Sequence, residues 1–144
     1  MAIVRQILKQ KGNQIFSVQP QDTVLDALNL LAEKQIGAVL VMEEDELKGI
    51  FSERDYARWG RLQKNPLQTP VSELMTRVVY YVTPDNTVEE CMIQMTDKRI
   101  RHLPVIENGK VAGVISIGDV VKMIIEDKDD HIHGLERYIL GRRT

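Results

Sequence analysis

The segment Gly-Ile-Phe-Ser-Glu-Arg-Asp, residues 49–55, occurs a second time as Gly-Val-Ile-Ser-Ile-Gly-Asp, residues 113–119. The two copies lie 64 positions apart. The same shift, with no gap, pairs Pro20 with Pro84, Thr23 with Thr87, Val24 with Val88 and Ile36 with Ile100. A repeat at fixed spacing predicts two copies of one supersecondary unit, each too small to bury much core alone. The two units are therefore expected to pack together, and a cleft between them is the natural place for a ligand.

The composition argues against a protein that coats nucleic acid, is secreted or spans a membrane. The chain has 144 residues, 43% of them hydrophobic, and a net charge of −2, which argues against a protein that coats nucleic acid. Its one cysteine, Cys91, cannot form an internal disulfide, which favours a reducing, cytoplasmic setting. We find no secretion signal and no apolar run near the roughly 20 residues of a membrane helix.

Each unit is expected to follow the order strand, helix, strand, strand, helix, in a mixed α/β (α+β) fold with the units related by a pseudo-twofold axis. Apolar periodicity, caps and turn residues carry this interpretation, and an Asn-Gly pair at 108–109 is a strong hairpin signal. The first unit is predicted at 15–18, 23–36, 38–42, 47–52 and 53–62, and the second at 78–82, 87–98, 102–106, 111–116 and 119–127.

These elements predict the domain boundaries. Residues 14–63 form the first repeat and 78–127 the second, joined by a proline-containing linker at 64–77. Residues 1–13 are predicted to be a lead-in helix and residues 128–144 a C-terminal tail with a last helix. Residues 4–8 resemble residues 71–75, so each unit is expected to carry its own short lead-in helix.

The repeated heptapeptide combines a hydroxyl and a carboxylate at the start of a helix. Ser52 can cap the helix, and free N–H groups there attract anions. Asp55, three residues later, can accept hydrogen bonds from sugar hydroxyls, so ribose and phosphate together suit the site. The same Ser-x-x-Asp spacing is also an ordinary capping box, and its duplication does not separate the two interpretations.

These motifs resemble a pair of cystathionine-β-synthase (CBS) domains, a Bateman module of the small stand-alone type. The resemblance covers residues 1–127 and includes Arg-His-Leu-Pro-Val at 101–105 and Ser-Glu-Arg-Asp-Tyr at 52–56. It implies binding of AMP, ADP, ATP, NAD or S-adenosylmethionine between the repeats, without catalysis. No metal is expected, because the sequence shows no zinc spacing and His131 and His133 lie in a polar tail without a Cys/His partner set.

The resemblance assigns residues to two clefts. Aspartate would meet ribose hydroxyls, serine the ribose or phosphate, apolar strand residues the adenine, and basic side chains the phosphates. The first cleft would use Ile50, Ser52, Arg54, Asp55, Ile100, Arg101 and His102. The second would use Val114, Ser116 and Asp119, with Ile36, Gly37 and Ala38 opposite.

The two clefts are expected to differ in charge. Where the second unit has Arg101 and His102, the first has Gly37 and Ala38, and Arg54 corresponds to Gly118. Three donors can therefore meet a phosphate in the Asp55 cleft, so a phosphate-bearing ligand should prefer it.

The favoured function is a cytoplasmic, non-catalytic sensor module for signal transduction. It would bind AMP or NAD, form a homodimer and report to an unidentified effector protein. A structural or interaction dimer without a physiological ligand is the alternative. For a third interpretation, an enzyme acting on nucleotides, the sequence offers no general base or metal set.

Overall fold

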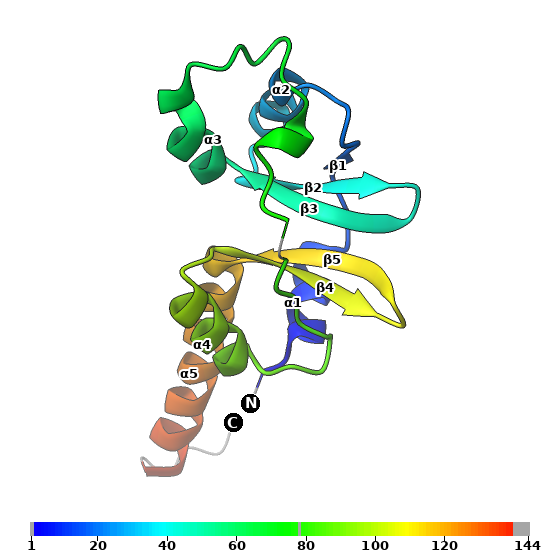
Figure 1. Ribbon diagram of the computed structural model, residues 1–144. Helices are drawn as coiled ribbons and strands as arrows, with labels where there is room; N and C mark the ends of the chain where they lie inside the picture. The colour runs from blue at the N-terminus through cyan, green and yellow to red at the C-terminus, as the bar shows by residue number, and fades with distance from the viewer. Residues whose placement is uncertain (1, 78, 140–144) are drawn as a thin grey trace.

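The computed structural model describes residues 2–77 and 79–139, with side chains described up to residue 129. Figure 1 shows two similar units, one above the other, whose sheets face each other. The first unit contains β1 (Ser17–Val18), α2 (Val24–Lys34), β2 (Ala38–Glu43), β3 (Glu46–Ser52) and α3 (Glu53–Trp59), followed by the short 3-10 helix η1 (Gly60–Leu62). The second contains α4 (Val88–Lys98), β4 (His102–Glu107), β5 (Lys110–Ser116) and α5 (Ile117–Ile139). Helix α1 (Val4–Lys11) precedes the first unit in the chain, and the 3-10 helix η2 (Val71–Glu73) precedes the second.

The two sheets share their register. Strand β2 pairs antiparallel with β3, and β4 pairs antiparallel with β5. The register shifts between Val41 and Met42 in one sheet and between Val105 and Ile106 in the other, again 64 residues apart. The predicted tandem α+β repeats are therefore confirmed down to the position of a β-bulge.

The first strand of the second unit differs from the prediction. In the first unit β1 runs parallel to β2, and the Leu40 N–H donates to the Phe16 carbonyl at 3.1 Å. The residue equivalent to Leu40 is Pro104, which has no N–H to donate. Within 79–82, the described part of the predicted strand 78–82, only Val82 pairs, as an isolated bridge to Val105.

Matching caps begin and end the two equivalent helices. The hydroxyls of Thr23 and Thr87 each accept the backbone N–H three residues later, which completes a capping box. Both helices then end in the left-handed conformation, with φ of 54° at Gln35 and 55° at Arg99. Neither end uses glycine, and local backbone bonds close both turns: the Ile36 N–H donates to the Leu31 carbonyl at 3.1 Å and the Ile100 N–H to the Met95 carbonyl at 3.0 Å.

The two lead-in segments are exchanged between the units. Ala2, Val4 and Ile7 belong to the hydrophobic core of the second unit, whereas Val71 and Leu74 belong to the core of the first. Isolated bridges join Ile3 to Thr87 and Thr23 to Pro70. The expectation that each unit carries its own lead-in helix is wrong in this respect, because each segment covers the core of the other unit.

The last helix is longer than predicted. The helix expected at 119–127 begins at Ile117 and continues to Ile139, through the charged segment that was assigned to a tail. Residues 128–139 contain no proline and one glycine, Gly134, so polarity alone does not end the helix. Within the described residues, no helix has the length and apolar character needed to cross a membrane.

Candidate functional site

The heptapeptide forms the same capped turn in both units. The backbone N–H of Ser52 donates to Asp55 Oδ2 at 2.9 Å, and the Asp55 N–H donates to Ser52 Oγ at 3.2 Å. In the second unit the corresponding distances between Ser116 and Asp119 are 2.8 and 3.2 Å. This is the capping box expected from the sequence, and it fixes each carboxylate at the end of a strand.

The glycine that opens each heptapeptide allows a close approach. A Cβ atom on Gly49 would lie 2.7 Å from Met75 Sδ and 2.8 Å from the Thr76 carbonyl oxygen. A Cβ atom on Gly113 would lie 2.7 Å from a methyl carbon of Leu8. The neighbour that requires glycine is thus the exchanged lead-in segment.

A cavity of about 750 Å³ opens beside Asp55, within the size range of small-molecule sites. It lies between the end of β3 with α3, on one side, and the end of α4 with the start of β4, on the other. The linker closes a third side. Its lining residues are Gly37, Ile50, Ser52, Glu53, Arg54, Asp55, Arg58, Thr76, Val79, Tyr80, Lys98, Arg99, Ile100, Arg101 and His102.

Asp55 is buried in this cavity, with 6% of its surface exposed. Its Oδ2 accepts from the N–H and the hydroxyl of Ser52, and its Oδ1 accepts from the Thr76 hydroxyl at 2.9 Å. A carboxylate offers about four acceptor positions. The carboxylate is therefore held rigidly and keeps capacity for one further donor.

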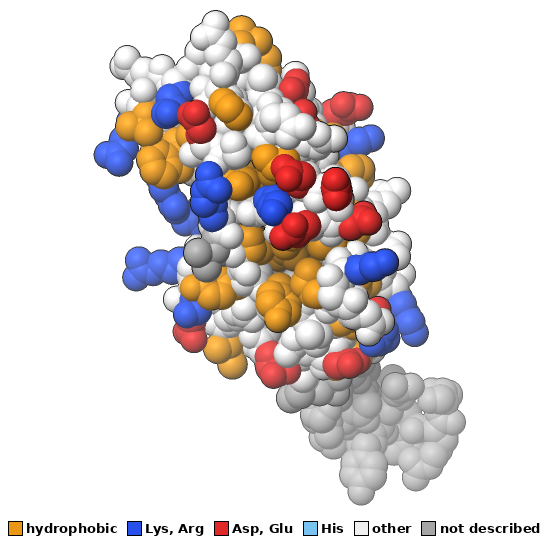
Figure 2. Space-filling view, turned by 45° about the vertical axis from the view of Figure 1, so that its right-hand side comes forward, with side chains coloured by type: hydrophobic (Ala, Val, Ile, Leu, Met, Phe, Trp, Pro, Cys, Tyr) orange, Lys and Arg blue, Asp and Glu red, His pale blue; other side chains and the backbone are white. Residues whose placement is uncertain are grey.

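Basic side chains outnumber acidic ones in the cavity wall. Five lining residues are arginine or lysine and two are acidic. Lys98 Nζ lies 5.0 Å from the centre of the Tyr80 ring, and the Arg54 guanidinium donates to the Arg99 carbonyl at 3.2 Å, bridging the two units. Figure 2 shows Lys and Arg side chains projecting at the level where the units meet. The wall can hold an anionic group.

His102, at the start of β4, packs against Gly37 of the first unit. A Cβ atom on Gly37 would lie 3.0 Å from His102 Cε1 and 3.1 Å from Nε2, so a larger residue there would displace the ring. Burial lowers the pKa of His102, and the nearby charges of Lys11 and Arg101 lower it further, whereas Asp119 and Asp55 raise it. The ring therefore lies within the field of both aspartates and favours its neutral form.

A small cavity of about 70 Å³ lies between α1 and α5 beside Asp119, lined by Ile7, Gln10, Lys11, Asp119, Lys122 and Met123. Lys11 Nζ donates to Asp119 Oδ2 at 2.7 Å and to the Val114 carbonyl at 3.0 Å. Partial burial raises the pKa of Asp119, but hydrogen bonds from Lys11 and Ser116 outweigh it, and the pKa is lowered overall.

The first predicted cleft is brought together in full. Its seven predicted residues all line the Asp55 cavity. The sequence interpretation did not include Thr76, Val79, Tyr80, Arg58 or Lys98. The 64-residue repeat relates Lys98 and Tyr80 to Lys34 and Phe16. In each pair the lysine ammonium lies over the aromatic ring, so a lysine and an aromatic residue at equivalent positions were the available sequence signal.

Of the residues predicted for the second cleft, Gly37 lines the Asp55 cavity, where it faces His102. Ile36 packs against the first core and Ala38 is buried, so neither lines either of these two cavities. Val114 and Ser116 contact Lys11 and Asp119, but of the predicted set only Asp119 lines the small cavity.

The CBS domain family matches residues 4–61 and 71–126 of the chain. A mitochondrial CBS domain-containing protein of Arabidopsis thaliana, CBSX3, is 35% identical over 151 aligned positions, covering 96% of this chain and 72% of that protein. A putative signal-transduction protein with CBS domains from Burkholderia ambifaria superposes with a TM-score of 0.85 at 48% identity, over 88% of this chain and 96% of that one. A CBS domain protein from Pyrobaculum aerophilum, solved in complex with AMP, superposes with a TM-score of 0.72 at 22% identity, over 81% and 88% of the two chains. The chain therefore belongs to the CBS domain family and consists largely of two CBS repeats.

Proposed function

We propose that this chain binds an adenine nucleotide, AMP or NAD, in the Asp55 cavity and acts as a non-catalytic sensor for an effector protein. One observation carries the proposal. A single cavity of about 750 Å³ combines a fixed carboxylate with five basic side chains from both units.

The lining residues suit each part of such a ligand. Ile50, Val79 and Ile100 offer apolar surface for an adenine ring. Asp55 Oδ1 can accept one ribose hydroxyl in addition to Thr76. Arg54 and Arg101 would then meet the phosphates, since arginine presents its donors in the geometry that phosphate oxygens accept.

The charge of the wall favours nucleotides over S-adenosylmethionine. The basic residues outnumber the acidic ones, and the sulfonium of S-adenosylmethionine is positive where a phosphate is negative. The AMP complex of the Pyrobaculum protein adds support at the level of the fold, because the same architecture holds an adenine nucleotide there.

Titration calorimetry with AMP, NAD, ADP, ATP and S-adenosylmethionine tests the proposal. We expect micromolar or tighter binding of AMP or NAD and weaker binding of S-adenosylmethionine. At a ligand concentration about 100 times Kd, the free energy of unfolding should rise by roughly 2.7 kcal/mol. Absence of binding for all five would reject the proposal and favour an interaction module without a ligand.

A further inference from the structure

The helices of the two units differ in the surface that they expose. Helices α4 and α5 pack side by side on the second unit (Figure 1). On them Ile93, Val121 and Ile125 are 61%, 40% and 55% exposed. At the equivalent positions of the first unit, 64 residues earlier, the exposed residues are Asn29, Ala57 and Arg61. The same positions of the repeat are therefore apolar in the second unit and polar or small in the first.

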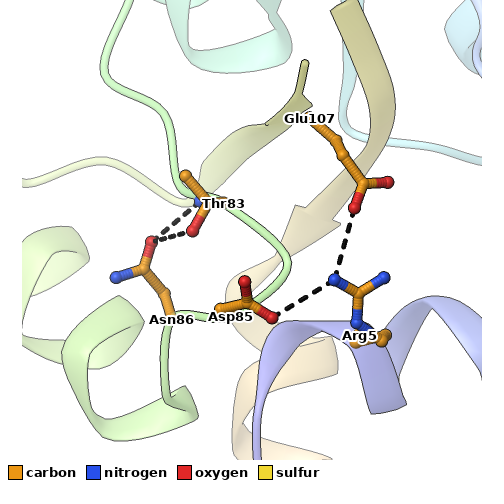
Figure 3. Close-up of polar contacts among 5 residues, drawn as sticks. All are labelled: Arg5, Thr83, Asp85, Asn86 and Glu107. Atoms are coloured by element: carbon orange, nitrogen blue, oxygen red, sulfur yellow. Dashed lines mark hydrogen bonds and ion pairs between the residues drawn. The ribbon is translucent and has the colours of Figure 1, made fainter.

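Another side of the second unit is covered by the chain itself. The Gln10 amide of α1 donates to Glu126 of α5 at 3.2 Å. Figure 3 shows the Arg5 guanidinium of α1 between Asp85 and Glu107, at 3.2 Å from each carboxylate. Helix α1 is thus fixed to the second unit by polar contacts as well as by the core, whereas the three apolar residues of α4 and α5 stay exposed to solvent.

Charges of opposite sign border the apolar residues on the two helices. Ile93 lies three residues after Glu90 and four before Asp97, so the three residues share one face of α4. On α5, Ile125 is followed three residues later by Lys128. Both carboxylates and the lysine are exposed. The surface is therefore complementary to itself, because α4 of one copy can pack along α5 of another with apolar side chains between them and opposite charges at the border.

We propose that the α4/α5 face of the second unit, formed by Ile93, Val121 and Ile125, docks on the same face of a second copy of this chain, and that the helices of the first unit stay outside the contact. Each copy contributes the same face to such a twofold contact, so α4 of each copy meets α5 of the other. The inference concerns assembly and does not depend on the proposed ligand.

Pairing the second unit with the first unit of another copy fits the surface less well. It would bring the two exposed isoleucines against a surface that carries Asn29 and Arg61. Removing an arginine from water beside apolar side chains is unfavourable unless a carboxylate pairs with it. The contact between two second units buries apolar side chains against apolar side chains and needs no such compensation.

Sedimentation equilibrium on the full chain, without nucleotide, tests this inference. Ile93→Asn combined with Ile125→Arg gives the second unit the residues that the first unit already has at the equivalent exposed positions. Wild type should be a dimer, and the dimer dissociation constant should rise at least about tenfold in this double variant. Val121→Asp should also weaken the dimer. Ala57→Asp, at the equivalent position of the first unit, is the matched control and should leave the dissociation constant within about twofold of wild type.

Three results would overturn the proposal: a wild-type mass near 16.5 kDa, an unchanged dissociation constant in the double variant, or equal effects of Val121→Asp and Ala57→Asp. Hydrogen exchange of the wild-type chain at two protein concentrations gives a readout that needs no variant to fold. Protection that increases with concentration should appear in α4 and α5. The same protection in α2 and α3 would overturn the restriction of the contact to the second unit.

Discussion

Replacing Arg101 by alanine separates a phosphate-binding role from a structural one. The side chain is exposed and lines the Asp55 cavity, and within the described residues it makes no hydrogen bond or ion pair. Its removal should therefore change the free energy of unfolding by no more than about 0.5 kcal/mol. A hydrogen bond between charged groups contributes about 1.5–3 kcal/mol. Affinity for AMP should fall by a factor of about 10 to about 150.

Calorimetry with AMP and adenosine checks this estimate. Adenosine lacks the phosphate, so its affinity should be the same for wild type and Arg101→Ala. Arg61→Ala is a matched control, because Arg61 is also exposed but does not line the cavity. Equal losses for AMP and adenosine, or an unchanged affinity for AMP, would refute the assignment of Arg101 to a phosphate.

Three further predictions concern stability, pH and assembly. Gly49→Ala should lower the free energy of unfolding by about 1–3 kcal/mol, and by more than Gly113→Ala, because the new methyl meets a backbone carbonyl in the first case and only a flexible leucine in the second; equal losses in denaturant titrations would contradict this. Burial lowers the pKa of His102, so as the pH falls below about 6.5 the unfolded chain takes up a proton before the folded one. The melting temperature should therefore decrease from pH 7 to pH 5, and a decrease just as steep in His102→Asn would rule out this origin. The chain should form a homodimer, since Ile93 on α4 and Ile125 on α5 are 61% and 55% exposed; light scattering that gives a mass near 16.5 kDa would exclude a dimer.

Most of the fold was predictable because the same capping, turn and hairpin signals occur in both repeats. The capping threonines, the heptapeptide turns and the hairpins each depend on residues within a few positions of one another. The prediction of a first strand at 78–82 was wrong because Pro104, on the neighbouring strand, has no backbone N–H to donate to it. That loss is visible in the sequence only once the pairing partner is known.

The candidate site was predictable where it follows the repeat and not where the chain crosses between units. Arg54, Arg101 and His102 came from comparing equivalent positions. Thr76 joins the site because the linker pairs with β3, and Lys11 reaches Asp119 because α1 packs on the opposite unit. Both are tertiary contacts between segments that periodicity and capping signals do not connect.

The exchanged lead-in segments decide how the molecule can be divided. A fragment cut within the linker after residue 63 would keep α1 but lose the second core that α1 covers. It would also lose Val71 and Leu74, which complete its own core. A single repeat is therefore not an independent folding unit, and the two halves should unfold in one cooperative transition. A circular permutant with new ends between the repeats would fold only if its new connection let each lead-in segment reach the core of the opposite unit.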